Sequence, residues 1–234
     1  MNSKKIVNNK LYKYQDSINN NIHPGDPKGL SDDYFSKTIV IIDAGFLSKL
    51  SKYFGGGRYL KYNIINFSKS IAKKQDFICE HIYYYTAPPF QSNKPTKEES
   101  ERYKNYENFK NKLLKENIIS IREGRCQRLK IDGKFIYGQK GVDALAIIDL
   151  MSVPLLYKDM KTIILIANDS DFVPVVKKLK EFNINVILYT HYLKNRKSSF
   201  SRSNELLKAV SKYVELIKED FDIAPLDKSE VPKQ

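Results

Sequence analysis

The chain has little cysteine and no long apolar segment. Its two cysteines, Cys79 and Cys126, provide neither a disulfide framework nor the spacing of a Cys/His zinc site. No apolar run approaches the roughly 18 residues that are needed to span a bilayer. The first five residues, Met1 to Lys5, lack the hydrophobic stretch of a signal peptide. We therefore expect a cytoplasmic protein without a membrane partner.

The charge balance favours a polyanionic partner. The 234 residues include 40 Lys+Arg and 27 Asp+Glu, for a net charge of +13. Such an excess indicates nucleic acid first and an anionic membrane surface second. The composition is also rich in Asn, Ile and Tyr, as in AT-rich genomes, so charge alone is modest evidence. Hydrophobic residues make up 41%, which is enough for a core and excludes wholesale disorder.

Apolar runs alternate with helical patterns, which predicts a parallel α/β sheet with right-handed crossovers. We expect strands at 38–43, 77–86, 118–121, 162–168, 185–190 and 213–217. Helices are expected at 46–54, 63–74, 97–117, 141–156, 171–182 and 204–211. Residues 125–137 predict a β-hairpin that turns at Asp132-Gly133, a favoured type I′ pair. Residues 1–36 are interpreted as an N-terminal extension, 37–218 as one domain and 219–234 as a polar tail.

Four aspartates flank the predicted strands and helices. Asp43 closes the first strand, Asp169 and Asp171 follow the strand at 162–168, and Asp143 opens a helix. Functional residues of open parallel sheets gather beyond the carboxyl ends of the strands. Two carboxylates about 4 Å apart repel by roughly 4 kcal/mol at an effective dielectric near 20. A bound Mg²⁺ or Mn²⁺ relieves such crowding. The alternative is that each aspartate caps a helix or turn independently.

Two short motifs carry these aspartates. Asp169-Ser170-Asp171 joins a strand to a helix N-terminus, where negative charge or a phosphate is favoured. Phosphatases of the haloacid dehalogenase type, Toprim nucleases and many glycosyltransferases also use Asp-x-Asp, and the phosphatases place it after the first strand. Lys140 precedes the helix that begins near Asp143, where it could reach a phosphate. Asp149 lies about 240° further round that helix and is not expected to share the face of Asp143.

Basic residues form two groups near these motifs. These residues could contact RNA phosphates, with Tyr137, Tyr192 or Phe200 available to stack on bases. The alternative is that they form a solvated, lysine-rich surface without a binding role. The first group is Arg122, Arg125, Arg128, Lys130, Lys134 and Lys140. The second, after the strand at 185–190, is His191, Lys194, Arg196, Lys197 and Arg202. His191 is in addition a weak candidate proton donor.

In residues 37–218 the chain resembles the NYN domain, and within it the LabA-like proteins, which are relatives of PIN-domain nucleases. The resemblance is carried by Asp43 after the first strand, by the stretch from Lys140 to Asp143, and by the stretch from Asp169 to Pro174. It implies a three-layer α/β/α fold with a mostly parallel sheet of five or six strands. It also implies a metal-dependent ribonuclease. The implied catalytic and metal-binding residues are Asp43, Asp143, Asp169 and Asp171.

The sequence departs from the family pattern at two places. The first motif is commonly Asp-Gly-x-Asn, but here Asp43 is followed by Ala44-Gly45-Phe46. The pair before the Asp-x-Asp motif is commonly Ser-Gly, but here it is Ala167-Asn168. The missing Asn removes one polar contact to metal or substrate.

We therefore expect a ribonuclease that hydrolyses RNA with Mg²⁺ or Mn²⁺. The alternatives are a catalytically weak RNA-binding or regulatory protein on the same fold and a structure-specific DNA nuclease. The oligomeric state stays open, a homo-oligomer included. The expected RNA-binding residues are Lys140, Ser170, Arg125, Arg128, Lys130, Lys194 and Arg196.

Overall fold

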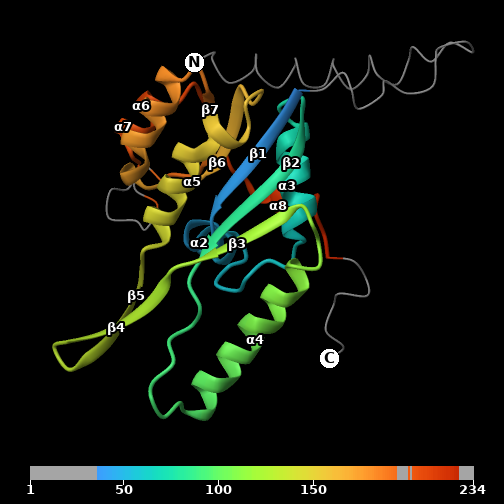
Figure 1. The fold of residues 1–234 in the computed structure, drawn as a ribbon. Helices are drawn as coiled ribbons and strands as arrows, with labels where there is room; N and C mark the ends of the chain where they lie inside the picture. Colours follow the sequence, from blue (N-terminus) through green and yellow to red (C-terminus); the bar gives the residue numbers. More distant parts are fainter. Residues whose placement is uncertain (1–35, 194–199, 201, 227–234) are drawn as a thin grey trace, which may run out of the picture. The chain divides into compact units, whose positions relative to one another are not determined.

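The structure, a computed structural model, describes residues 36–193, 200 and 202–226. A parallel six-stranded sheet in the order β3-β2-β1-β6-β7-β8 forms its centre (Figure 1). Its strands are β1 (Ser36–Asp43), β2 (Phe77–Thr86), β3 (Ile119–Glu123), β6 (Thr162–Ile166), β7 (Asn185–Thr190) and β8 (Lys212–Glu215). The helices are α2 (Ala44–Phe54), α3 (Ile64–Lys73), α4 (Lys97–Leu113), α5 (Val142–Leu156), α6 (Val173–Glu181), α7 (Asn204–Ala209) and α8 (Lys218–Asp222), with a 3₁₀ turn η2 at Ser170–Phe172.

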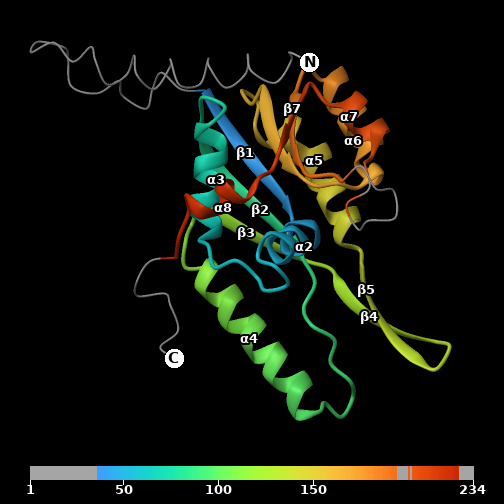
Figure 2. The ribbon, with the colours of Figure 1, turned by 180° about the vertical axis from the view of Figure 1, so that it is seen from behind.

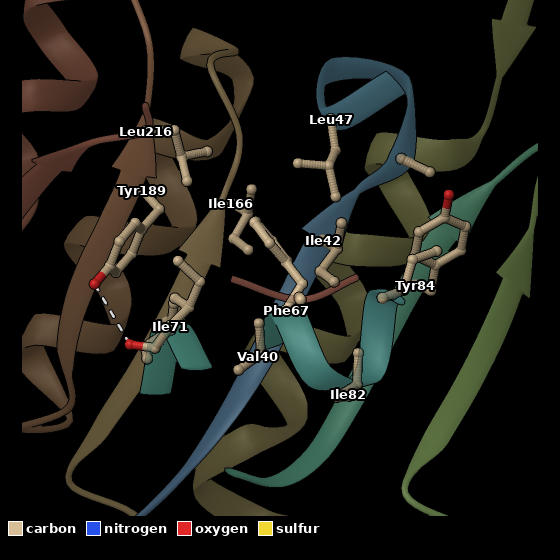
Figure 3. Close-up of a cluster of buried hydrophobic side chains, with 14 of the residues drawn as sticks. Val40, Ile42, Leu47, Phe67, Ile71, Ile82, Tyr84, Ile166, Tyr189 and Leu216 are labelled. Atoms are coloured by element: carbon tan, nitrogen blue, oxygen red, sulfur yellow. Dashed lines mark hydrogen bonds between the residues drawn. The ribbon is translucent and has the colours of Figure 1, made fainter. Parts of the chain in front are cut away.

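Both faces of the sheet are covered, as the continuous apolar runs at residues 39–42 of β1 and 163–166 of β6 require. Val40 and Ile42 of β1 point into one core, and Ile39 and Ile41 point into the other. The first core lies under α2, α3 and α8, and the second under α5, α6 and α7 (Figures 1 and 2). Figure 3 shows the first core, in which the Tyr189 hydroxyl donates to the Ile71 carbonyl at 3.4 Å. The predicted α/β fold with a parallel six-stranded sheet is confirmed.

The chain order of the strands reverses between β1 and β6. From β1 the chain builds β2 and β3 to one side, and it later returns to place β6, β7 and β8 on the other. β1 and β6 are parallel neighbours, with Val40 opposite Ile164 and Ile42 opposite Ile166. Their carboxyl ends therefore lie side by side. A crevice at such a reversal point is where open α/β sheets bind ligands.

The predicted hairpin forms a separate two-stranded sheet. β4 (Arg125–Ile131) pairs antiparallel with β5 (Lys134–Lys140), and this ribbon, residues 125–140, projects away from the six-stranded sheet (Figures 1 and 2). Asp132 and Gly133 have φ angles of 49° and 77°, the left-handed pair that a type I′ turn requires.

The segment after residue 218 packs on the first core, although we expected a polar tail from 219. Phe221 is 1% exposed, and its ring lies 4.9 Å from that of Tyr62 and 5.1 Å from that of Phe67. The buried Asp220 pairs with Lys74 and accepts a hydrogen bond from the Ile217 amide. Phe221 and Asp220 thus anchor this acidic stretch on the domain. The limits of the extension and of the tail stay predictions, since 1–35 and 227–234 lie outside the described residues.

In the described part of the chain, helices long and apolar enough to cross a membrane are lacking.

Cys79 is buried, and burial raises the pKa of its thiol to about 12. Such a thiol stays protonated at neutral pH and is a poor nucleophile.

Candidate metal centre

Asp43 ends β1 and at the same time caps α2. Its Oδ1 accepts a hydrogen bond of 3.1 Å from the Phe46 amide, as an N-cap carboxylate does. Burial raises the pKa of Asp43, the amides of Phe46 and Gly45 oppose that rise, and the nearby Asp169 adds to it. Asp43 is therefore both a cap and a member of a crowded acidic group.

Asp143 lies in the first turn of α5, next to Gly141. Gly141 has a φ of 81°, a left-handed conformation that lets the chain turn sharply from β5 into the helix. Burial is the largest cause that raises the pKa of Asp143, followed by the charges of Asp43, Asp169 and Asp171. The charges of the other three aspartates thus all act on Asp143.

Asp169 and Asp171 follow β6 at the neighbouring position of the sheet edge. The Asp169 carboxylate accepts from the Asp171 amide at 2.9 Å and caps the 3₁₀ turn η2. Carboxylate oxygens of Asp143, Asp169 and Asp171 all lie within 4.8 Å of one another. Asp43 lines the same pocket as Asp143 and Asp169. The structure therefore brings the four predicted aspartates together at the carboxyl edge of β1 and β6.

This donor set fits a divalent cation. Opposite oxygens around an ion with bonds of about 2.1 Å are about 4.2 Å apart, close to the 4.8 Å limit that the three carboxylates already satisfy. Hard oxygen ligands of this kind suit Mg²⁺ and Mn²⁺. Burial first and the charges of the neighbouring aspartates second raise the pKa of Asp143, and a bound cation would offset the repulsion among these charges.

The pocket around the aspartates has a volume of about 650 Å³ and a mixed rim. Lys49 of α2 and Arg202, which precedes α7, bring positive charge to it. Gln139 of β5 brings a carboxamide, and Ser170 brings a hydroxyl. A Cβ placed on Gly45 would lie 3.1 Å from Asp43 Oδ1 and 3.2 Å from Gln139 Oε1. The Gln139 amide therefore lies beside the Asp43 carboxylate.

Sequence reasoning missed Lys49 and Gln139. The alternation of side chains along a strand could have found Gln139, because it places residues 139 and 140 on opposite faces of β5. Lys140 lines a separate depression with Arg125 and with Ala144 and Leu145 of α5. The expected phosphate contact of Lys140 stays a prediction, while the pocket itself offers Lys49 and Arg202 for that role.

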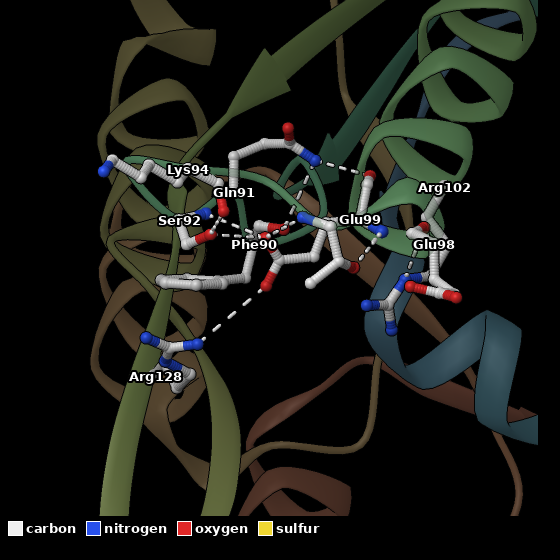
Figure 4. Close-up of polar contacts among 9 residues, drawn as sticks. Phe90, Gln91, Ser92, Lys94, Glu98, Glu99, Arg102 and Arg128 are labelled. Carbon is white, nitrogen blue, oxygen red and sulfur yellow. Dashed lines mark hydrogen bonds and ion pairs between the residues drawn. The ribbon is translucent and has the colours of Figure 1, made fainter.

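The other basic residues have varied surroundings. The Arg128 guanidinium lies 3.9 Å from Glu99 Oε1 and 4.5 Å from the ring centroids of both Phe90 and Phe135 (Figure 4). Lys130 is exposed on the ribbon. Lys194 and Arg196 lie outside the described residues. The RNA contacts expected of all these residues remain predictions.

Residues at the unusual motif positions take structural roles. Phe46, which stands where the family commonly has Asn, is buried with its ring 6.4 Å from that of Phe200. The side-chain Oδ1 of Asn168 accepts a hydrogen bond from the Thr190 hydroxyl at 3.1 Å. His191 is buried, with Nδ1 3.1 Å from the Leu216 carbonyl and its ring against aromatic neighbours. These contacts give His191 a packing role and weaken its candidacy as a proton donor.

Comparison with known proteins agrees with this geometry. The model of the NYN domain family matches residues 37–217. Among solved structures, the fold is similar to that of a protein of unknown function from Vibrio parahaemolyticus, with 16% sequence identity and a TM-score of 0.52. The similarity covers 82% of this chain and 99% of that chain, and at this identity it concerns the fold alone. No curated protein matches the chain.

Proposed function

We propose that this chain, which belongs to the NYN domain family, is a divalent-metal-dependent ribonuclease of the LabA-like subgroup. The observation that carries the proposal is the set of three carboxylates within 4.8 Å of one another at the sheet edge, two of which line one pocket with the half-buried Asp43. Independent helix caps would not require three acidic side chains to share one point. A cluster of this kind has an electrostatic cost that a cation offsets.

Asp143, Asp169 and Asp171 are proposed to hold Mg²⁺ or Mn²⁺, with Asp43 as a fourth acidic residue of the site. A bound ion of this type activates water for in-line attack and stabilises charge on a phosphate. The protein contributes the fixed position of the ligands. Asp43 is held by the Phe46 amide and Asp169 by the Asp171 amide, so two ligands are oriented before any ion arrives.

The substrate phosphate is proposed to bind on the cationic rim. Both Lys49, on α2, and Arg202, in the segment before α7, line the pocket. Their positive charges would orient a phosphodiester and offset its repulsion from the carboxylates. Gln139 and Ser170 add uncharged hydrogen-bonding groups at the same pocket.

The buried Phe46 favours a second candidate function, a catalytically weak RNA-binding protein. An aromatic side chain at this position takes the place of a polar group in the Asp43 motif. The Phe46 ring packs in the core. Such a protein would bind RNA through the same basic surface with little turnover.

Cleavage of labelled RNA and of DNA of the same sequence tests the proposal. The full chain with Mn²⁺ is expected to cut RNA, and EDTA or the Asp143→Asn substitution should abolish the cutting. RNA binding without Mn²⁺-dependent cleavage would instead support the second candidate. Preferential cutting of DNA would identify a DNA nuclease.

A further inference from the structure

The two faces of the ribbon differ in chemistry. Directly opposed residues of an antiparallel pair share a face, and successive residues alternate between faces. Arg128 is opposite Tyr137, Lys130 is opposite Phe135 and Cys126 is opposite Gln139. These six residues define the first face. The second face is formed by Arg125, Gln127, Leu129, Ile131, Lys134, Ile136, Gly138 and Lys140.

The first face leads into the aspartate pocket, because Gln139 belongs to both. Phe135, Tyr137 and Gln139 follow one another along β5 toward the aspartates. Residues on one face of a strand are spaced by about 6.7 Å. The second face leads elsewhere, since Arg125 and Lys140 line a depression against the outer side of α5.

Aromatic rings and positive charge alternate on the first face. Phe135 is 53% and Tyr137 47% exposed, so about half of each side chain is open to solvent. The Phe90 ring lies 5.7 Å from that of Tyr137 and extends the aromatic surface. The Arg128 guanidinium lies 4.5 Å from the ring centroids of both Phe90 and Phe135, and Figure 4 shows Phe90 and Glu99 beside it. Three rings and a stacked guanidinium thus form a preorganised platform.

The second face has no aromatic ring to offer. Its exposed apolar residues are the aliphatic Leu129, Ile131 and Ile136. Aliphatic side chains lack the flat π surface on which a base stacks, so the difference between the two faces concerns stacking and not merely charge. Lys134 on this face is a useful counterpart to Lys130 on the other.

We infer that the first face of the ribbon binds a single-stranded segment of the nucleic-acid substrate, which then enters the aspartate pocket over Gln139. Bases stack on Phe135 and Tyr137, and phosphates approach Lys130, the combination by which single strands are bound. The ring spacing of about 6.7 Å is about twice the 3.4 Å rise of a stacked nucleotide. Only a strand with splayed, unpaired bases can therefore reach successive rings. This inference rests on the proposed nuclease site for its direction, but not for the binding itself.

Binding of fluorescently labelled single-stranded RNA to the full chain in EDTA tests this inference, because no cleavage interferes. The double substitution Phe135→Leu/Tyr137→Leu removes the rings and keeps apolar bulk. We expect it to weaken single-strand binding by roughly 10- to 100-fold, the scale of losing base stacking, and to leave duplex binding within about twofold. The matched control, Leu129→Ala/Ile136→Ala on the second face, should leave both within about twofold.

Measuring RNA affinity at several salt concentrations distinguishes Lys130 on the first face from Lys134 on the second. Lys130→Ala should lower the magnitude of the log–log slope of affinity against salt by about 0.7, as expected for one phosphate contact on a single strand. Lys134→Ala on the second face should leave the slope unchanged. Circular dichroism and melting curves would verify that each variant is folded.

Several outcomes would overturn the platform. One is an equal loss of RNA affinity from the two double substitutions, and another is an unchanged RNA affinity after Phe135→Leu/Tyr137→Leu. A third is that Phe135→Leu/Tyr137→Leu changes the oligomeric state and not the RNA affinity. The last would assign the face to a contact between copies of the chain. If the rings bind RNA but the wild type never cleaves it, the nuclease proposal fails and the platform stands. If the ring variant binds and cleaves like the wild type, the platform fails and the nuclease proposal stands.

Discussion

Asp143 and Asp149 belong to the same helix, α5, but their carboxylates have different partners. Asp143 offers an oxygen within 4.8 Å of those of Asp169 and Asp171. Asp149 accepts hydrogen bonds from Arg122, at 2.7 and 2.8 Å, and from the Tyr85 hydroxyl at 3.0 Å. One carboxylate belongs to the acidic cluster of the candidate metal centre, and the other ties α5 to β2 and β3.

Substitution of these two residues should therefore separate catalysis from stability. Asp143→Asn is expected to lower cleavage by about 100-fold or more, the scale for removing a group that stabilises the transition state. Asp149→Asn should leave turnover within about twofold and lower the free energy of unfolding by about 1–3 kcal/mol, because hydrogen bonds to charged groups are lost. Single-turnover cleavage and urea denaturation measure the two effects. Equal losses of turnover would mean that Asp149 also acts at the metal centre.

In the metal-free protein, Asp143→Asn should be stabilising and the gain should depend on pH. Burial and three neighbouring carboxylates raise the pKa of Asp143 above its ordinary value of 3.8. The folded state therefore carries no penalty below the ordinary pKa, where the group is protonated in both states; the penalty grows as pH rises past that value and is complete above the raised pKa. At neutral pH we expect a gain of about 1 kcal/mol or less, since solvent screens a partly exposed group. Denaturation in EDTA at several pH values would test this, and a gain that persists below the ordinary pKa would contradict it.

Mn²⁺ should stabilise the wild type without any substrate. A ligand that binds only the folded state stabilises it by about 2.7 kcal/mol at 100 times its Kd. The melting temperature should rise with Mn²⁺ concentration, and Asp143→Asn should remove most of that rise. Asp149→Asn is the control, with a lower melting temperature but the same response to Mn²⁺. No response in the wild type would count against a cation at these carboxylates.

Gly45→Ala should weaken the metal centre without unfolding the protein. The added Cβ would lie 3.1 Å from Asp43 Oδ1 and 3.2 Å from Gln139 Oε1, so one of these groups must move by a few tenths of an ångström. We expect Mn²⁺ affinity to fall by about 10-fold, as for other groups that orient metal ligands. Gly138→Ala is the control, since nothing lies within 4 Å of a Cβ there. Mn²⁺ titration followed by melting temperature measures both variants, and equal affinities would show that the site adapts freely.

Glu99 should stabilise the start of α4 and the segment before it in a pH-dependent way. Its carboxylate accepts from the Ser92 hydroxyl and amide and completes a capping box with Thr96. Hydrogen bonds from Ser92 lower the pKa of Glu99 from its ordinary 4.5. The stability it contributes is thus fully present above pH 4.5 and is lost as pH falls through the lowered pKa. Glu99→Gln should lower the melting temperature at neutral pH and progressively less below about pH 4.5, whereas the exposed Glu101→Gln should change little.

The sheet and the meeting point of the aspartates could be predicted because both depend on local signals. Continuous apolar runs identified β1 and β6, and parallel neighbours place Asp43 and Asp169 at one edge. Lys49 could not be assigned, because a lysine on an exposed helix surface gives no signal of what it faces. The contact of Arg128 with Glu99 joins the ribbon to the start of α4, and no spacing in the sequence relates the two. Phe221 was missed because a single ring in an acidic stretch has no periodicity.

The separation of the ribbon from the six-stranded sheet affects how such a protein can diversify. Among the described residues, the pairings of β4 and β5 involve only each other, so the hydrogen bonds of the sheet do not depend on the ribbon's length or side chains. Insertions, deletions and charge reversals near its turn at Asp132-Gly133 would therefore leave the strand pairings of the sheet in place. Changes at Asp43 or Asp143 disturb a helix cap or a crowded pocket at once. Preference among substrates can therefore drift in the ribbon while the chemistry at the sheet edge stays the same.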